Sequence, residues 1–241
     1  GQHYRYGTGN DEISCATANF RDGLHFPQDC CNPLALSNLP YTGPVGNYTS
    51  ACSPAGCYDM SGNIDEWCTD WYDFSYYDVS PQYNPCNTAS TRYRALRGGT
   101  WGSVASDCRS AWRGGATPGF AERTGGGRGF RVARSAVAVE CEEDGLEESE
   151  ITVALPGGVP LELVRIPPGS FQMGSPDTER SRDDDEGPVH TVNIAYDFYM
   201  GKYEVTQAQW LAVMGSWPGT SPSSEEGLGD NYPAYHISWN D

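Results

Sequence analysis

Short runs of apolar side chains bounded by turn residues mark the last third of the chain as a series of strands. Residues 151–155, 161–166 and 170–173 form three such runs, and Pro-Gly-Gly and Pro-Pro-Gly sequences separate them. Apolar runs of this length between Gly and Pro are typical of β-strands. Residues 189–194 alternate between apolar and polar positions and predict a fourth, half-buried strand.

The segment 206–214 predicts the clearest helix. Thr206 is a suitable N-cap, because its hydroxyl can accept a hydrogen bond from the first turn. Trp210, Leu211 and Met214 recur at a spacing that places them on one face of an amphipathic helix. Residues 181–186 are almost entirely charged and predict a charged loop.

Composition divides the chain into three blocks. Residues 1–134 are rich in Gly, aromatic residues and Cys, whereas residues 135–150 carry six Glu and one Asp without an aromatic residue. The second block is therefore expected to be an exposed acidic linker. Residues 151–241 form the third block, and we expect the first and third blocks to make one domain. With 29 Gly and 17 Pro, the chain should have few helices and many loops.

The charge balance narrows the classes of partner. The formal net charge is −17, and phosphate backbones are bound by clustered Lys and Arg, so a nucleic-acid partner is not expected. No stretch approaches the ~20 apolar residues of a membrane span. Most carboxylates are expected to be solvated, so a metal site has to be argued from a local motif.

Nine cysteines in 241 residues favour disulfides and an oxidising, extracytoplasmic compartment. No C-x-x-C pair or zinc-finger spacing occurs, and the odd number leaves one thiol without an intramolecular partner. The first residues lack the pattern of a signal peptide, so the sequence fits a mature, truncated or rearranged chain. The cysteines are Cys15, Cys30, Cys31, Cys52, Cys57, Cys68, Cys86, Cys108 and Cys141.

Eight motifs spread over the first and third blocks are together highly specific. In the third block they are RIPPGSFQMGS at 165–175, PVHTV at 188–192, FYMGKYEVTQAQW at 198–210 and HISWND at 236–241. In the first block they are YRYG at 4–7, YDMSGNIDEW at 58–67, LRGGTW at 96–101 and GFRV at 129–132. The chain thereby resembles the formylglycine-generating-enzyme-like, or sulfatase-modifying-factor, superfamily.

The order of the motifs differs from the family's order. In the family the PPGSF motif comes first and the GFR strand ends the domain, and a middle segment that would lie between Asp241 and Gly1 is missing here. Three explanations remain open: a circular permutant, the end of one domain joined to the start of a tandem copy, or an artefact of chain assembly. In the second case neighbouring molecules would complete each other, and a head-to-tail contact could build a polymer.

The resemblance implies an α+β fold of the C-type-lectin-like kind, with a small twisted antiparallel sheet, few helices and much ordered loop. It also implies a structural Ca²⁺ held by Asp59, Gly62, Ile64 and Glu66, because calcium prefers carboxylate and carbonyl oxygens in a tightly turned loop. The alternative is an ordinary Asx/Gly turn with solvated acids. A second family calcium site would use Asn19 and Phe20, but its acidic partner falls near Ser37 or Asn38, which makes that site doubtful.

In the oxidases of this family two cysteines, five residues apart, bind copper(I). The resemblance places these positions at Ser103 and Cys108, and a hydroxyl is a poor ligand for Cu(I). Copper and oxidase activity are therefore not expected, and Cys108 is expected to be structural, for example paired with Cys68. The four histidines are scattered, and no nucleophile elbow, Walker loop or H-E-x-x-H motif occurs.

Many relatives display loop side chains over the stretch 101–128, where recognition residues commonly lie on a rigid scaffold. We expect a ligand surface there; the alternative is that Trp101 and Trp112 are core residues and the rest is ordinary loop. The hypothesis is a calcium-stabilised binding domain for a protein or glycan ligand or for copies of itself, with an oxidase or a subunit of an extracellular polymer as alternatives. The residues expected to line the surface are Trp101, Ser103, Ser106, Asp107, Trp112 and Glu122.

Overall fold

A computed structural model describes residues 4–23, 41–119, 127–136 and 148–241. Strands and loops dominate this part of the chain, and its α-helices are short. In chain order the elements are β1 (Asp65–Tyr72), α1 (Tyr76–Val79), β2 (Tyr93–Arg97), η1 (Ala105–Cys108), β3 (Gly114–Ala116), β4 (Arg128–Gly129), β5 (Ala133–Ser135), β6 (Glu150–Ala154), η2 (Pro156–Gly158), β7 (Pro160–Ile166), β8 (Gly169–Met173), η3 (Asp184–Glu186), β9 (His190–Ile194), β10 (Phe198–Gly201) and α2 (Gln207–Met214).

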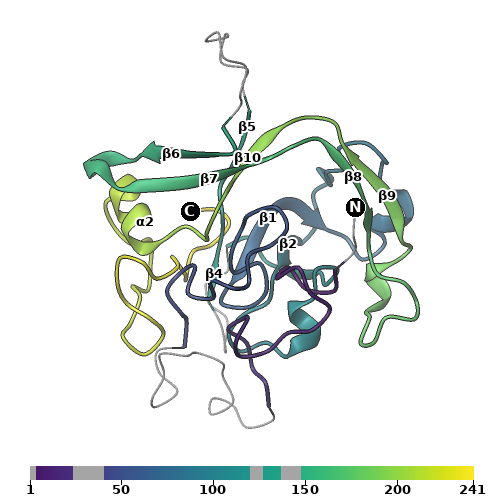
Figure 1. Ribbon diagram of the computed structural model, residues 1–241, viewed down its shortest axis with the longest axis horizontal. Helices are drawn as coiled ribbons and strands as arrows, with labels where there is room; N and C mark the ends of the chain where they lie inside the picture. The colour runs from purple at the N-terminus through teal and green to yellow at the C-terminus, as the bar shows by residue number, and fades with distance from the viewer. Residues whose placement is uncertain (1–3, 24–40, 120–126, 137–147) are drawn as a thin grey trace.

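The strands form two four-stranded sheets and a separate hairpin. One sheet has the order β3-β2-β1-β4, the other has the order β5-β10-β7-β6, and β8 pairs with β9. All pairings are antiparallel except that of β1 with β4. In Figure 1 the strands β7 and β10 run above β1 and β2, with the β8–β9 hairpin on one side and α2 on the other. The expected loop-rich α+β fold is confirmed.

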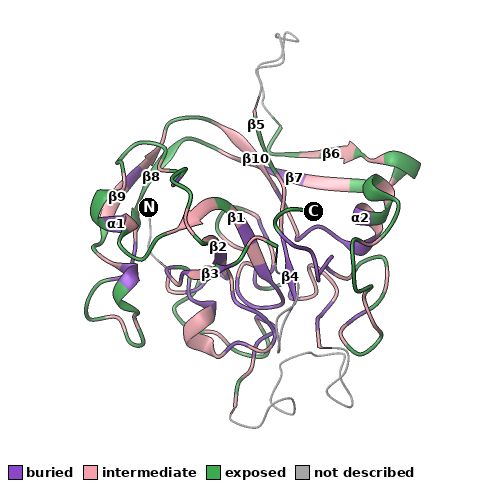
Figure 2. Cartoon of the chain, turned by 180° about the vertical axis from the view of Figure 1, so that it is seen from behind, coloured by how far each residue is buried: buried purple, intermediate pink, exposed green. Residues whose placement is uncertain are grey.

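The first and third blocks of the sequence pack directly on each other. β5 pairs with β10 through the register Phe198↔Ser135 and Met200↔Ala133. The indole nitrogen of Trp67 donates to the carbonyl of Ile237 at 2.8 Å. Both blocks therefore contribute to a common core, and Figure 2 shows its buried residues gathered along β1, β2, β4 and the adjoining loops.

The strands predicted in the third block are confirmed to within one residue, as β6, β7, β8 and β9. The ends of the predicted linker differ: Ser135 and Glu150 are strand residues, because β10 and β7 supply backbone partners for them. Residues 137–147 of that linker lie outside the described residues. The division into three blocks otherwise stays a prediction.

Helix α2 begins where the sequence predicts. The hydroxyl of Thr206 accepts a hydrogen bond from the backbone of Gln209, whose side chain accepts one from the backbone of Thr206. This reciprocal arrangement is a capping box. The predicted apolar face is only partly right, because Trp210 is buried whereas Leu211 and Met214 are 47% and 49% exposed.

The reason is that Gln207 and Trp210 are the helix residues buried against the rest of the protein. The side chain of Gln207 donates to the carbonyls of Gly227 and Pro233, and the ring of Trp210 packs against Phe130 and Trp217. Residues at the C-terminal end of α2 project beyond these contacts. Within the described ranges, no helix has both the length and the apolar character that a bilayer crossing requires.

The charged segment 181–186 also differs from expectation. Asp185 and Glu186 are 4% and 0% exposed, and they lie in η3 rather than in an open loop. Arg113 donates to the carbonyl of Asp185, and Arg109 forms an ion pair with Glu186. Cationic partners from a distant part of the chain therefore make this burial possible, since a buried charge requires a partner.

Candidate functional site

Asp59, the first predicted calcium ligand, is a buried residue in a left-handed conformation. The φ angle of Asp59 is +56°, and the residue is 9% exposed. One of its carboxylate oxygens accepts a hydrogen bond from the backbone amide of Gly46 at 2.6 Å. Burial raises the pKa of Asp59 to about 6, although the Gly46 bond and the Arg131 charge act in the opposite direction. The reading of Asp59 as a solvated acid is therefore wrong.

Gly62 and Ile64 lie in a turn that packs closely against neighbouring backbone. Gly62 has a φ of +86°, and a Cβ atom there would lie 2.2 Å from the carbonyl oxygen of Asn19. Its amide donates to the carbonyl of Gly98, and Ile64 is completely buried. Only glycine fits this position, because it combines a positive φ with a backbone contact on the Cβ side.

Glu66, the fourth predicted ligand, is held by a guanidinium. Arg131 Nε lies 3.0 Å and 2.8 Å from the two carboxylate oxygens of Glu66, and Arg131 Nη2 lies 2.6 Å from one of them. Arg131 also donates to the carbonyl of Tyr58, one residue before Asp59. This multiple contact fixes the Glu66 side chain beside the turn.

Glu204 brings a further buried carboxylate to the same region from the third block. It is 1% exposed, accepts a hydrogen bond from the Asn63 side chain at 2.6 Å, and accepts another from the amide of Ile64. Burial, with the charges of Asp59 and Glu66, raises the pKa of Glu204 well above its usual value. The sequence analysis missed Glu204, although a glutamate inside the apolar and aromatic motif at 198–210 is the signal that would have found it.

The charge balance of this cluster fits a cation. Asp59, Glu66 and Glu204 surround Arg131, and they outnumber this cation by two charges when all are ionised. Asn19 adds a side-chain oxygen that is buried without a hydrogen-bond partner among the described residues. The described residues do not gather three or more His, Cys, Asp or Glu side chains as a metal cluster. A calcium ion here would therefore depend on backbone carbonyls for much of its coordination, as the predicted role of Gly62 and Ile64 requires.

The structure describes only some of the residues of the second calcium site that the family resemblance implies. Asn19 and Phe20 are both 1% exposed, and the Asn19 amide donates to the carbonyl of Tyr41. Ser37 and Asn38 lie outside the described residues. The second calcium site stays a prediction.

The two positions that resemble the copper ligands lie in a closed environment. Cys108 is 0% exposed and packs against Tyr6, Ala18 and Phe20. Burial raises the pKa of its thiol, so the neutral form is favoured. Ser103 is 5% exposed, and its hydroxyl accepts a hydrogen bond from the amide of Thr100.

The expected pairing of Cys108 with Cys68 is wrong, because both are free thiols. Cys52, Cys57 and Cys86 are free as well, whereas Cys15 is disulfide-bonded. Cys108 instead fills an apolar cluster as a small hydrophobic side chain, which is a common role for a buried thiol.

The predicted ligand surface contains core residues. Trp101 is 3% exposed and stacks on Tyr41, with ring centroids 4.3 Å apart. The expectation that Trp101 and Ser103 lie on the surface is therefore wrong: each is enclosed by other parts of the chain. Ser106 and Asp107 are half-buried in η1 and hydrogen-bonded to each other at 2.9 Å, and Trp112 is half-buried. Glu122 lies outside the described residues.

Comparison with known proteins agrees with the motifs. A model of the Sulfatase-modifying factor enzyme 1-like domain matches residues 1–136 and 156–241. Serine/threonine-protein kinase pkn1 of Chlamydia caviae is 43% identical over 95 residues, which cover 39% of this chain and 15% of the kinase.

Two further relatives match parts of similar length. The formylglycine-generating enzyme of Streptomyces coelicolor is 36% identical over 98 residues, which cover 39% of this chain and 30% of that enzyme. The chaperone protein LppX of Paenibacillus barcinonensis is 33% identical over 105 residues, which cover 43% of this chain and 31% of that protein. The chain thus spans less than a third of each of these three relatives.

Proposed function

Because this chain belongs to the Sulfatase-modifying factor enzyme 1-like family, we propose that it is a non-catalytic, calcium-stabilised binding domain that works outside the cytoplasm. The observation that carries the proposal is the state of Cys108. A copper-dependent oxidase of this family would need two accessible thiolates, whereas here a buried neutral thiol is accompanied by the hydroxyl of Ser103.

Both positions lack the properties of copper ligands. Soft thiolates select Cu(I), and a hydroxyl does not replace them. A Cβ atom on Gly99 would lie only 2.9 Å from the Cys108 sulfur, so the backbone closes one side of the thiol. Tyr6 and Phe20 pack against other sides of the Cys108 thiol. A metal with an oxygen molecule would have no room at this sulfur without a rearrangement of the N-terminal segment.

The buried acidic cluster supports the structural role of calcium. If Glu204 is to be ionised at neutral pH beside Asp59, a further cation has to offset its burial. Millimolar calcium outside cells suits a site of modest affinity. The free thiols give the proposed location no support of their own, so the location rests on this calcium argument.

The ligand is proposed to be a protein or a glycan that contacts the surface near η1. Ser106, Asp107 and Trp112 are the members of the predicted surface that retain exposure. The loop around them is anchored by the stacking of Trp101 on Tyr41 and by the Thr100–Ser103 turn. A rigid support of this kind lowers the entropy that binding costs.

A copper titration tests the proposal. Copper(I) is added to the wild type and to Cys108→Ala, and oxygen consumption is followed with a cysteine-bearing sulfatase peptide. We expect the same copper affinity for both proteins and no copper-dependent turnover. The Cys108→Ala control accounts for copper bound by the other free thiols. Turnover by the wild type that is lost in Cys108→Ala would overturn the proposal.

The similarity to the Streptomyces coelicolor formylglycine-generating enzyme favours an oxidase as the second candidate. Ser103→Cys separates the two functions, because it restores the missing sulfur. If the chain is an oxidase that lost one ligand, this variant gains copper affinity and turnover. If the closed packing around Cys108 prevents copper from binding, Ser103→Cys gains neither copper affinity nor turnover.

A further inference from the structure

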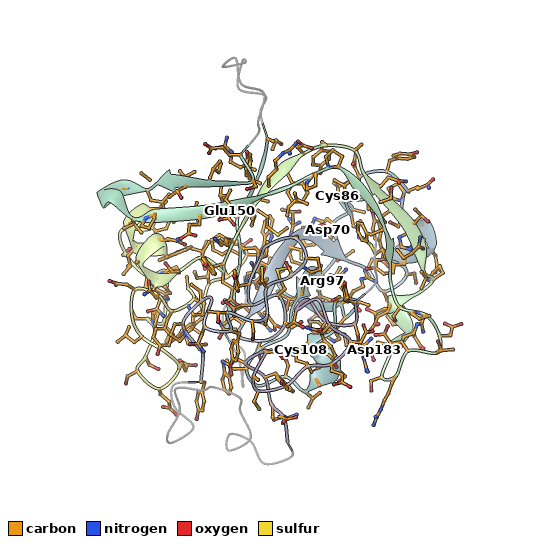
Figure 3. The ribbon with its side chains drawn as sticks, viewed as in Figure 1. Asp70, Cys86, Arg97, Cys108, Glu150 and Asp183 are labelled. Carbon is orange, nitrogen blue, oxygen red and sulfur yellow. The ribbon has the colours of Figure 1, made fainter. Side chains whose placement is uncertain are left out.

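A cavity outside the sites discussed above opens between β1, β2, α1 and β8. It has a volume of about 130 Å³. Its walls include Asp70, Trp71, Tyr76, Tyr77, Arg97 and Met173. Figure 3 shows Asp70 and Arg97 in the region between the β1–β2 pair and the β8–β9 hairpin. Small ligands generally bind in concave sites that combine apolar walls with a few polar groups.

An irregularity in the sheet creates the cavity. Between the pairs Trp67↔Leu96 and Trp71↔Arg94, β1 has three residues where β2 has only Ala95. The surplus residues bulge out of the ladder, and Cys68, Asp70 and Ala95 all line the cavity. Bulges are frequent next to binding sites because they redirect side chains.

Arg97 brings a positive charge to the cavity. Its Nη1 donates to the carbonyls of residues 110, 111 and 112, and its Nη2 donates to the hydroxyl of Tyr77 at 2.8 Å. Among the described residues, no carboxylate oxygen lies within 4 Å of the Arg97 guanidinium nitrogens. The neighbouring Arg113 differs, because Asp185 lies 3.9 Å from it.

Asp70 presents the opposite charge. One of its oxygens accepts a hydrogen bond from the amide of Asn87 at 2.8 Å. Its second oxygen has no hydrogen-bond partner in the described part of the chain, and Asp70 forms no ion pair there. A carboxylate and a guanidinium thus line the same cavity without a direct ion pair, although the charge of Asp70 acts over a longer distance to raise the pKa of Arg97.

Tyr77 completes the polar wall. It is 5% exposed, and its oxygen accepts the hydrogen bond from Arg97. A guanidinium cannot accept a hydrogen bond in return, so the hydroxyl hydrogen of Tyr77 remains to be donated, and no described residue accepts it. The charge of Arg97 polarises this hydroxyl and makes it a stronger donor.

Trp71 supplies a rigid apolar wall. The guanidinium of Arg94 lies 3.7 Å from the centre of its ring and 3.5 Å from that of Trp239. This sandwich fixes the Trp71 ring from one side. Tyr76 and Met173 add further apolar surface to the lining.

We propose that this cavity binds a small zwitterion of the α-amino-acid type. The ammonium group pairs with the open oxygen of Asp70, and the carboxylate accepts from the Tyr77 hydroxyl and faces Arg97. The apolar part of the ligand packs against Trp71 and Met173. A ligand of a single charge would leave either Asp70 or Arg97 without an opposite charge in direct contact in a partly dehydrated site, which is unfavourable. The inference goes beyond the proposed function and uses none of its residues.

Calorimetry on the whole chain tests the inference from the ligand side. The standard L-amino acids are screened at millimolar concentration for a rise in the unfolding temperature, and those that raise it are titrated. Each is compared with its N-acetyl and its C-terminal amide derivative, which lack one charge. We expect at least one amino acid to bind. Each of its two derivatives should bind at least about tenfold more weakly, because a charge-assisted hydrogen bond is lost. If no amino acid binds, or if a derivative binds equally well, the inference is wrong.

Three variants test the same inference from the protein side. Asp70→Asn retains an acceptor for Asn87 and removes the charge, and Tyr77→Phe removes the donor. Both are expected to weaken binding about tenfold or more. Asp78→Asn changes an exposed acid on α1 that does not line the cavity and should leave binding unchanged. Equal affinity for the wild type and Asp70→Asn would contradict the assignment of the ammonium site.

Discussion

Arg109 and Glu186 form a buried two-point ion pair between the two blocks of the chain that share the core. Arg109 Nη1 lies 2.7 Å from one Glu186 oxygen, Nη2 bonds to the other oxygen, and neither side chain is exposed. The hydroxyl of Ser175 donates to Glu186 at 2.6 Å, and Glu179 lies 3.0 Å from Arg109. Although burial acts in the opposite direction, the bonds from Arg109 and Ser175 lower the pKa of Glu186.

Glu186→Gln is expected to destabilise the fold by about 3–5 kcal/mol. Removal of one partner from a buried ion pair leaves the other charge poorly compensated, here with Glu179 as its remaining acid, and that cost exceeds the value of the pair itself. Urea unfolding of the wild type and the variant measures the change in the free energy of unfolding.

Asp177→Asn is the matched control, because Asp177 lies 3.5 Å from Arg182 but its side chain is 95% exposed. Solvent screens such a pair, so its loss should not change the unfolding midpoint measurably. Equal effects of the two substitutions would contradict the role of Arg109 and Glu186 as a junction between the blocks.

Asp59→Asn is expected to stabilise the calcium-free chain in a pH-dependent way. Burial raises the pKa of Asp59 from 3.8 to about 6, so the folded state holds this proton more tightly than the unfolded state. The resulting stabilisation is complete below about pH 4 and is lost as the pH rises through about 6. The variant should therefore match the wild type near pH 4 and exceed it by roughly 3 kcal/mol at pH 7. Urea unfolding in EDTA at several pH values measures the difference, which would be independent of pH if Asp59 were solvated.

Calcium is expected to raise the unfolding temperature of the EDTA-treated wild type at pH 7.5. A ligand that binds only the folded state stabilises it in proportion to the logarithm of its concentration. The rise should be smaller at pH 5, because protons compete for Asp59. Magnesium serves as the control ion, since it demands a smaller octahedral site. Equal effects of the two ions, or the same effect at both pH values, would count against the site.

Gly62→Ala is expected to destabilise the fold more than Gly157→Ala. Both glycines have a positive φ, +86° and +75°, so both substitutions carry the left-handed penalty of about 1–2 kcal/mol. At Gly62 the added carbon would also lie 2.2 Å from the Asn19 carbonyl, whereas at Gly157 nothing lies within 4 Å. Thermal unfolding compares them. Similar losses for the two variants would show that the turn at Gly62 relaxes easily.

Alkylation with iodoacetamide, followed by mass spectrometry, should separate the free thiols by accessibility. Cys86 is exposed, whereas Cys57 and Cys108 are 1% and 0% exposed. Burial raises the pKa of both buried thiols, and only the thiolate reacts. We expect Cys86 to react first and Cys108 to react only on unfolding. Rapid labelling of Cys108 in the folded chain would contradict the closed packing on which the proposed function rests.

The sequence by itself determined the local elements and the family. Pro-Gly turns bounded the strands β6, β7 and β8, and Thr206 marked the start of α2, because these signals act over a few residues. Gly62 likewise predicted a turn, since glycine is the residue that best tolerates the positive φ found there. The motifs were enough to identify the family although their order differs from the family's order, because each motif reflects a short local structural requirement.

Only the tertiary structure decided which polar residues are buried. Charged sequence around Glu186 predicts exposure, yet Arg109, 77 positions away, makes its burial favourable. Trp101 and Ser103 were expected on a surface and are enclosed by segments from elsewhere in the chain. The cavity beside Asp70 depends on a mismatch between two strands that neither strand's sequence contains. Burial and cavities are properties of contacts between distant segments, so short-range patterns cannot specify them.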